Sequence, residues 1–383
     1  MITPGIDFKI FKTKSKNKKI KKLFQNLISK KDDLLTSLGK NYKDSYTRKT
    51  LKKYKINPTF RLIGMGGSTL GAQTLYQFLN HKIKKKFLFV DNLQAVQKKN
   101  NSKLTNIVIS KSGNTIETIA NAHILIKKKD KNIFITENRQ NYLHILANKL
   151  KAEVIHHNNF IGGRYSVLSE VGMLPAELMG LKSENFRQFN SLIKNKYFIN
   201  ALISNVSSTL FLIKQKKYNS IIINYDKKSE NLFYWYQQLI AESLGKKKKG
   251  LLPIISNMPK DNHSLMQLYL DGFKNNFFTF FYVNEKKSDK INNNNILPQL
   301  GYLKNIYSKN IIYAQKKASE NIFNKKSIPF RSFEIKKRDE KTLGELFCFF
   351  ILETILIGKS LNLNPFDQPS VELVKNETKK FLI

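Results

Sequence analysis

From residue 60 onward, short apolar runs alternate with longer segments in which apolar residues recur every three or four positions. Strands are predicted in the runs that are short and rich in β-branched and aromatic residues, which in the first half of the chain are 60–66, 86–92, 105–110 and 132–136. Helices are predicted between them, at 69–79 and 114–128. Strand, helix and strand in repetition indicates a parallel sheet with helices on both faces.

The same alternation returns in the second half of the chain. Further strands are predicted at 219–225, 251–256 and 277–283. Helices are predicted where the apolar spacing is helical, at 202–214, 231–245, 341–362 and 371–382. We therefore predict an α/β fold with two doubly wound parallel sheets.

These elements divide the chain into four segments. Residues 1–55 are predicted to form a basic, helical N-terminal segment. Residues 56–195 are expected to form a first α/β domain and 196–340 a second, and 341–383 are expected to hold the C-terminal helices. A chain of 383 residues is long enough for two to three domains, each with its own core.

Composition excludes several classes of protein. With 41% hydrophobic and 11% aromatic residues, the chain is expected to be globular. The longest apolar stretch, 343–358, contains Glu345 and Glu353 and is too short to span a bilayer. The N-terminus has no uninterrupted apolar core, which argues against secretion. The single cysteine, Cys348, excludes a disulfide framework and a cysteine metal cluster, so we expect a cytoplasmic protein without a membrane partner.

The net charge of +39 raises the question of an anionic partner. Of the 67 basic residues only seven are Arg, although Arg is the residue that grips phosphates and guanine edges best. The lysines are also scattered along the chain. We interpret them as a compositional bias on solvated faces and expect no specific nucleic acid partner. A polyanion-binding surface stays open, and duplex DNA binding would then fall steeply with salt.

Two glycine-containing turns follow predicted strands. The sequence GGST at 66–69 opens a helix whose free N–H groups could hold an anion, although any strand-to-helix turn can use glycine. It does not fit the dinucleotide-binding pattern well. The sequence SKSGNT at 110–115 adds hydroxyl groups and a lysine to such a turn, which makes a phosphate cradle. The alternative is an ordinary capped helix with Glu117 as the capping-box partner.

Other polar residues stand out against their surroundings. Arg164 follows two glycines in a chain that uses lysine almost everywhere else, so a planar, permanently charged group is indicated there. Gln238 and Glu242 are four residues apart and share one face of a predicted helix. His263 is expected to open another helix, and Gln368 lies near the start of a C-terminal one. Taken singly, an exposed acid and a structural histidine are the ordinary alternatives.

Together these segments resemble phosphoglucose isomerases. The resemblance runs from about residue 60 to 379 and rests on six motifs in the family's order, which are GMGGSTLG, SKSGNTIET, GGRYSVLSEVG, QLIAESLGK, DNHSLMQL and NPFDQPSVELVK. Six motifs in order are far more specific than any one of them. The resemblance implies two sugar-isomerase (SIS) domains in a homodimer that interconverts glucose 6-phosphate and fructose 6-phosphate without a metal or cofactor.

The resemblance also assigns roles to individual residues. It implies that Glu242 carries the proton between C1 and C2, and that Arg164 stabilises the enediolate. It implies that His263, donated by the partner subunit, assists ring opening, and that Lys375 acts near the ring oxygen. The residues implied to contact the phosphorylated hexose are Gly67, Ser68, Ser110, Lys111, Ser112, Thr115, Gln238 and Gln368.

The side chains assigned by the resemblance suit the chemistry of the reaction. An aldose–ketose exchange needs a base, a cation near the developing oxyanion, and acid–base groups for ring opening, all of which these side chains can supply. The sequence holds no HExxH motif or paired-carboxylate cluster that would indicate a metal.

A catalytically silent phosphosugar-binding regulator is the second hypothesis, but it would not need all four catalytic groups. Departures from the family pattern at Leu244, Asn262 and Val374 concern substrate breadth, including mannose 6-phosphate.

Overall fold

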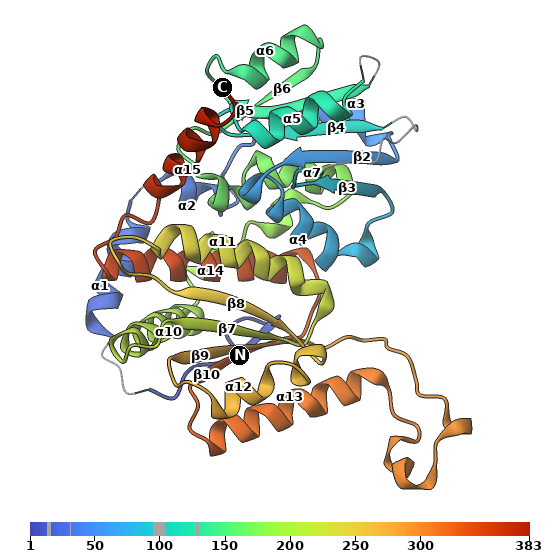
Figure 1. Cartoon of the computed structure of the whole chain (residues 1–383), viewed down its shortest axis with the longest axis vertical. Helices are drawn as coiled ribbons and strands as arrows, with labels where there is room; N and C mark the ends of the chain where they lie inside the picture. Colours follow the sequence, from blue (N-terminus) through green and yellow to red (C-terminus); the bar gives the residue numbers. More distant parts are fainter. Residues whose placement is uncertain (14–16, 31, 95–103, 128–129) are drawn as a thin grey trace.

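The computed structural model describes residues 1–13, 17–30, 32–94, 104–127 and 130–383. Two five-stranded sheets form two α/β layers, one above the other in Figure 1, with helices α11 (Glu230–Leu244) and α14 (Glu340–Ser360) between them. The predicted α/β class with two sheets is therefore confirmed. The last residue of the helix predicted at 114–128 lies outside the described residues.

The first sheet is entirely parallel and has the strand order β3-β2-β4-β5-β6. Its strands are β2 (Thr59–Gly64), β3 (Lys86–Val90), β4 (Thr105–Ile109), β5 (Lys131–Glu137) and β6 (Glu153–His157). The associated helices are α3 (Arg48–Lys55), α4 (Leu70–Phe78), α5 (Ile116–Leu125), α6 (Tyr142–Lys149) and α7 (Glu170–Met179). Strand β6 was not predicted, because this edge strand carries a polar sequence and is only partly buried.

The second sheet has the order β1-β10-β9-β7-β8. Its strands are β7 (Asn219–Asn224), β8 (Leu252–Asn257), β9 (Asn276–Val283), β10 (Phe330–Ile335) and β1 (Ile6–Lys9). The first four are parallel, but β1 pairs with β10 in the antiparallel direction. The N-terminal segment, expected to be helical, therefore begins with an edge strand. Phe8 holds it in place, since its ring lies 4.5 Å from that of Phe333.

The remaining helices cover faces and ends of the two sheets. They are α1 (Lys18–Ile28), α2 (Asp33–Ser37), α8 (Ser183–Phe186), α9 (Phe189–Leu192), α10 (Lys196–Lys214), α12 (Met266–Asp271), α13 (Ser308–Lys325) and α15 (Pro369–Lys380). The long apolar helix predicted at the C-terminal end is α14, which is buried over most of its length. Trp235 of α11 packs edge-on against Phe347 of α14, with 4.8 Å between ring centroids. Among the described helices, none is long and apolar enough to cross a membrane.

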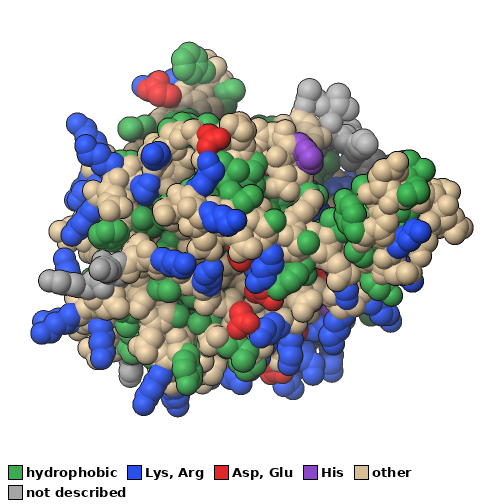
Figure 2. Space-filling view, turned by 90° about the horizontal axis from the view of Figure 1, so that it is seen from below, with side chains coloured by type: hydrophobic (Ala, Val, Ile, Leu, Met, Phe, Trp, Pro, Cys, Tyr) green, Lys and Arg blue, Asp and Glu red, His purple; other side chains and the backbone are tan. Residues whose placement is uncertain are grey.

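Basic side chains are spread over the surface rather than gathered into one stripe on the face that Figure 2 shows. Lys and Arg side chains are distributed around and across that face, with apolar and neutral side chains between them and few acids. This distribution is the one expected of lysines on solvated faces.

The ion pair between Arg331 and Glu353 is almost completely buried inside the second layer. Arg331 of β10 and Glu353 of α14 are both about 1% exposed and are bonded to each other through the guanidinium Nη1. Arg331 also donates to the side chains of Asn205 and Tyr236, at 3.0 and 3.1 Å. The Tyr236 hydroxyl in turn donates to Glu353 at 3.2 Å. The network thus satisfies two charges that would otherwise be costly to bury.

We expect Arg331→Met to lower the free energy of unfolding by about 3–5 kcal/mol, because it leaves the Glu353 carboxylate buried without its cation. Urea unfolding followed by circular dichroism measures this loss. In the double variant Arg331→Met/Glu353→Leu both charges are gone, so a large part of the stability should return. A double variant that loses more than either single variant would contradict this account of the pair.

Candidate active site

Two glycine-containing turns meet at the carboxyl edge of the first sheet. The 3₁₀ turn η1 (Gly66–Ser68) follows β2, and the turn η3 (Gly163–Leu168) packs against it. A Cβ atom on Gly67 would lie 2.3 Å from the carbonyl carbon and oxygen of Gly163, so any other residue at 67 would force the two backbones apart. Gly66 adopts a φ of +52°, which favours glycine. This contact brings the GGST turn and the arginine motif together.

Arg164 lies at the centre of the site with only 2% of its side chain exposed. Its Nη1 donates to Glu242 at 3.1 Å and to Gln368 at 2.7 Å. Its Nε donates to the hydroxyl of Ser243 at 2.8 Å, and Nη2 donates to the backbone carbonyls of Pro365 and Asp367. Only the planar guanidinium offers donors in this fixed arrangement, which explains why an arginine stands here in a lysine-rich chain.

Glu242 occupies the last turn of α11 and is 29% exposed. One carboxylate oxygen accepts from Arg164, and the other accepts from Gln238 Nε2 at 2.7 Å. Glu242, Gln238 and Gly66 line a cavity of about 610 Å³ between α11 and α4. The carboxylate is therefore held in two directions at the wall of a cavity large enough for a small ligand.

The segment after β4 is the candidate phosphate loop. The hydroxyls of Ser110 and Thr115 lie 2.9 Å apart, and the Ser112 hydroxyl accepts from the backbone N–H of Asn114. Thr115 is the N-cap residue of α5, yet its side chain makes no hydrogen bond to the helix backbone. The first turn of α5 is therefore not capped by the Thr115 side chain.

The loop's position and charge fit a site shared with the glycine turn. Gly64 of β2 pairs with Ile109 of the neighbouring parallel strand β4, so the turns after both strands leave the sheet side by side. The ammonium of Lys111 donates to the carbonyl of Asn159 at 2.7 Å and lies 3.4 Å from the carboxylate of Glu137. Lys111 is therefore a fixed cation within the loop, next to the carboxylate of Glu137.

His263 and Lys375 are not part of the arginine–glutamate cluster. His263 is exposed and follows the turn η5 (Lys260–Asn262), three residues before α12, so the expectation that it opens a helix was wrong. A backbone turn ending in the hydrogen bond from His263 N to Lys260 O takes up that position. Lys375 lies on α15, where its ammonium pairs with Glu372 at 2.7 Å. Ser68 is half-buried at the end of η1.

The groups that hold the segment 365–367 against Arg164 were not predicted from the sequence. Tyr165 and Arg164 both donate to the carbonyl of Pro365, at 2.9 and 2.8 Å. Lys246 holds the same segment through Asp367, with 2.5 Å between charges, and this hydrogen bond lowers the pKa of that carboxyl. Most of these bonds end on backbone carbonyls, which carry no signal in the sequence. Among the described residues, no group of three or more His, Cys, Asp or Glu could hold a metal ion.

Known proteins resemble this chain in sequence. The family model described as "Phosphoglucose isomerase" matches residues 41–252. The glucose-6-phosphate isomerase of Methanocaldococcus jannaschii is 30% identical over 377 residues, covering 91% of this chain and 90% of that protein. The glucose-6-phosphate isomerase of Acholeplasma laidlawii is 33% identical over 368 residues, covering 87% and 85%.

Solved structures share the fold. A hypothetical protein from Thermus thermophilus superimposes with a TM-score of 0.82 at 20% identity, over 96% of this chain and 94% of that one. A glucose-6-phosphate isomerase from Chlamydia trachomatis gives a TM-score of 0.74 at 18% identity, over 91% and 78%. At these identities the similarity concerns the fold alone.

Proposed function

The chain belongs to the phosphoglucose isomerase family, and from this premise we propose that it interconverts glucose 6-phosphate and fructose 6-phosphate. The observation that carries the proposal is the Glu242 carboxylate, which is held by Arg164 at 3.1 Å and by Gln238 at 2.7 Å at the wall of a cavity. A carboxylate and a buried guanidinium in contact are what the reaction requires of its base and its electrostatic partner.

The reaction moves one proton between neighbouring carbons. Glu242 removes the proton from C2 of the open-chain aldose and returns it to C1, while the electrons of the broken C–H bond form the enediolate. The oxygen that becomes negative is stabilised by Arg164, whose Nη1 donates to the side chains of Glu242 and Gln368. Because the other guanidinium nitrogens are fixed on Ser243 and two carbonyls, the charge is oriented before the substrate arrives.

The phosphate group is proposed to bind the loop at 110–115. Ser110, Ser112 and Thr115 supply hydroxyls there, and the first turn of α5 supplies backbone N–H groups. The sugar then extends toward the turn that holds Gly67 and Ser68, beyond which lie Gln238 and Gln368. Residues of this chain thus account for binding at one end of the hexose and chemistry at the other. The buried thiol of Cys348 suits a reducing cytoplasm, where we place the reaction.

The experiment that tests the function is a coupled isomerase assay on the purified chain with glucose, mannose and fructose 6-phosphates. We expect conversion of glucose 6-phosphate and fructose 6-phosphate in both directions, and the mannose arm measures substrate breadth. A protein that binds fructose 6-phosphate in a calorimetric titration without converting it would instead be a phosphosugar-binding regulator.

We also propose a homodimer in which His263 of the partner subunit completes the site and assists ring opening, with Lys375 acting near the ring oxygen. What supports this is that His263 is exposed and is not among the hydrogen-bond partners of Arg164 or Glu242 in its own chain, together with the family resemblance.

Mixing Glu242→Gln protein with His263→Ala protein tests the assembly. In a mixed dimer one site would combine an intact Glu242 with the intact histidine of the other chain. With random exchange, we expect recovery to about a quarter of wild-type activity, because half of the dimers are mixed and each has one working site. No recovery, with subunit exchange shown by differently tagged chains, would mean that His263 acts within its own chain.

A further inference from the structure

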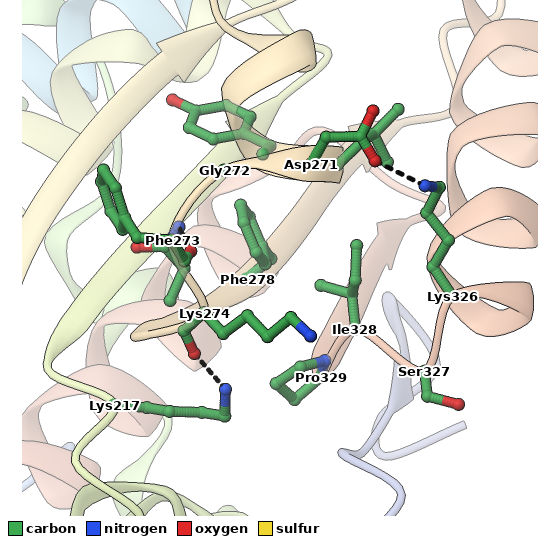
Figure 3. A pocket seen from close by; sticks show the side chains of 13 residues that line it. Lys217, Asp271, Gly272, Phe273, Lys274, Phe278, Lys326, Ser327, Ile328 and Pro329 are labelled. Atoms are coloured by element: carbon green, nitrogen blue, oxygen red, sulfur yellow. Dashed lines mark hydrogen bonds and ion pairs between the residues drawn. The ribbon is translucent and has the colours of Figure 1, made fainter.

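A second cavity lies at the amino ends of the strands of the second sheet. It has a volume of about 560 Å³ and is formed where strands β7, β9 and β10 begin and where α12 and α13 end (Figure 3). The loops proposed for catalysis follow the carboxyl ends of parallel strands, whereas this cavity sits at their amino ends. The two sites are therefore separate. A volume of this size is in the range of small-molecule sites.

The floor of the cavity is apolar and well packed. Phe278 of β9 is 1% exposed and meets the ring of Tyr269 edge-on at 5.2 Å. Ile328 and Pro329 form the wall opposite, at the start of β10. Phe273 also lines the cavity, but its side chain is 55% exposed. An exposed phenyl ring beside an apolar floor is a surface on which a flat ring can stack.

The rim of the cavity is cationic. Figure 3 shows Lys217 and Lys326 on opposite sides of the cavity, with Lys274 between them. Lys326 is paired with Asp271 at 2.7 Å, and Asp271 is the one acid among the described residues that line this cavity. No acid of this described lining therefore remains to neutralise Lys217 and Lys274.

The lysine positions are set by the fold. The Lys217 ammonium donates to the backbone carbonyl of Lys274, which ties the start of β7 to the loop before β9. Asn276 fixes the same loop by donating to the carbonyl of Phe273 at 3.2 Å, and it accepts from Asn219 at 2.8 Å. Burial, and then the nearby Lys274 ammonium, lower the pKa of Lys217, so a bound anion would relieve an unfavourable arrangement.

We propose that this cavity binds a small anion that carries a flat apolar ring, of the nucleoside phosphate class. The ring stacks on Phe273 over the apolar floor, and the phosphates accept hydrogen bonds from Lys217 and Lys274. Charge complementarity alone would admit any anion, whereas the floor and the exposed phenyl ring select for one with an aromatic part.

Isothermal titration of the full chain with ADP tests the site. We expect Lys217→Gln/Lys274→Gln to weaken ADP binding about tenfold or more, because two charge-assisted hydrogen bonds are lost. Adenosine and inorganic pyrophosphate, which each carry one half of the recognised chemistry, should bind at least about tenfold more weakly than ADP. Excess fructose 6-phosphate should leave the affinity for ADP unchanged, since it is proposed to occupy the other site.

Two further variants make the result decisive. Lys21→Gln/Lys22→Gln removes two exposed charges from α1 and is the matched control for general attraction to a +39 protein. Phe273→Ala removes only an exposed ring, so it tests the site even if the lysine pair proves necessary for folding. The proposal is overturned if the protein does not bind ADP at about 1 mM, or if pyrophosphate binds as tightly as ADP. It is also overturned if the control pair loses as much ADP affinity as the cavity pair, or if Phe273→Ala keeps the wild-type affinity. Competition between fructose 6-phosphate and ADP would overturn it as well.

Discussion

Glu242→Gln is expected to lower turnover of fructose 6-phosphate by about 10²–10⁴-fold while leaving its affinity within a few-fold of wild type. The amide keeps the shape of the side chain and can still accept a hydrogen bond from Arg164 or Gln238, so the cavity wall should persist. What the amide cannot do is take a proton from C2 and return it to C1. The coupled assay measures turnover, and calorimetry measures binding.

The matched control is Glu184→Gln, which makes the same chemical change on an exposed position of helix α8. It should behave as wild type in both measurements. If Glu242→Gln keeps full turnover, Glu242 is not the base. If turnover and affinity fall together, the carboxylate contributes to holding the substrate rather than to the proton transfer alone.

Arg164→Lys is expected to lower turnover by about 10²–10³-fold, close to the loss seen when one oriented oxyanion donor is removed from an enzyme. A lysine keeps the positive charge but has three donors on one nitrogen, so it cannot reach Ser243, Gln368 and the carbonyl of Pro365 together. The segment that carries Gln368 should also loosen. We therefore expect a lower melting temperature as well as slower turnover.

Arg48→Lys is the control for this prediction, because Arg48 is exposed on α3. It should change neither turnover nor melting temperature. An Arg164→Lys protein with wild-type turnover would show that positive charge alone suffices at this position and that the fixed geometry of the guanidinium does not matter.

Much of the fold could be predicted from the sequence because its central elements are strongly patterned. The runs that became β4 and β9 are buried along their whole length, and the long apolar stretch became the buried helix α14. Strands β1, β6 and β10 escaped detection. Strands β1 and β6 are short, lie at sheet edges and carry charged or histidine side chains, whereas β10 lies inside the second sheet but carries Arg331 and Glu334 in its short sequence. Their position depends on neighbouring strands that are far away in the sequence, such as β10 for β1.

The candidate site could also be predicted only in part. Residues that belong to compact motifs could be proposed from the sequence, and the structure brings Arg164, Glu242, Gln238 and Gln368 into direct contact. The carbonyls that fix Arg164 could not be predicted, because any residue type offers one. The role proposed for His263 depends on a partner subunit, and in this chain Lys375 pairs with Glu372 rather than with the cluster.

Hydrogen exchange at C2 of glucose 6-phosphate tests the central claim most directly, because it follows the transferred proton itself. In deuterated water, wild-type protein should introduce deuterium at C2, visible by NMR, whenever the enediolate returns to the aldose with solvent hydrogen on Glu242. Glu242→Gln protein with bound substrate should introduce deuterium at least about 10²-fold more slowly. Exchange at the wild-type rate in that variant would contradict the account, since another group would then carry the proton.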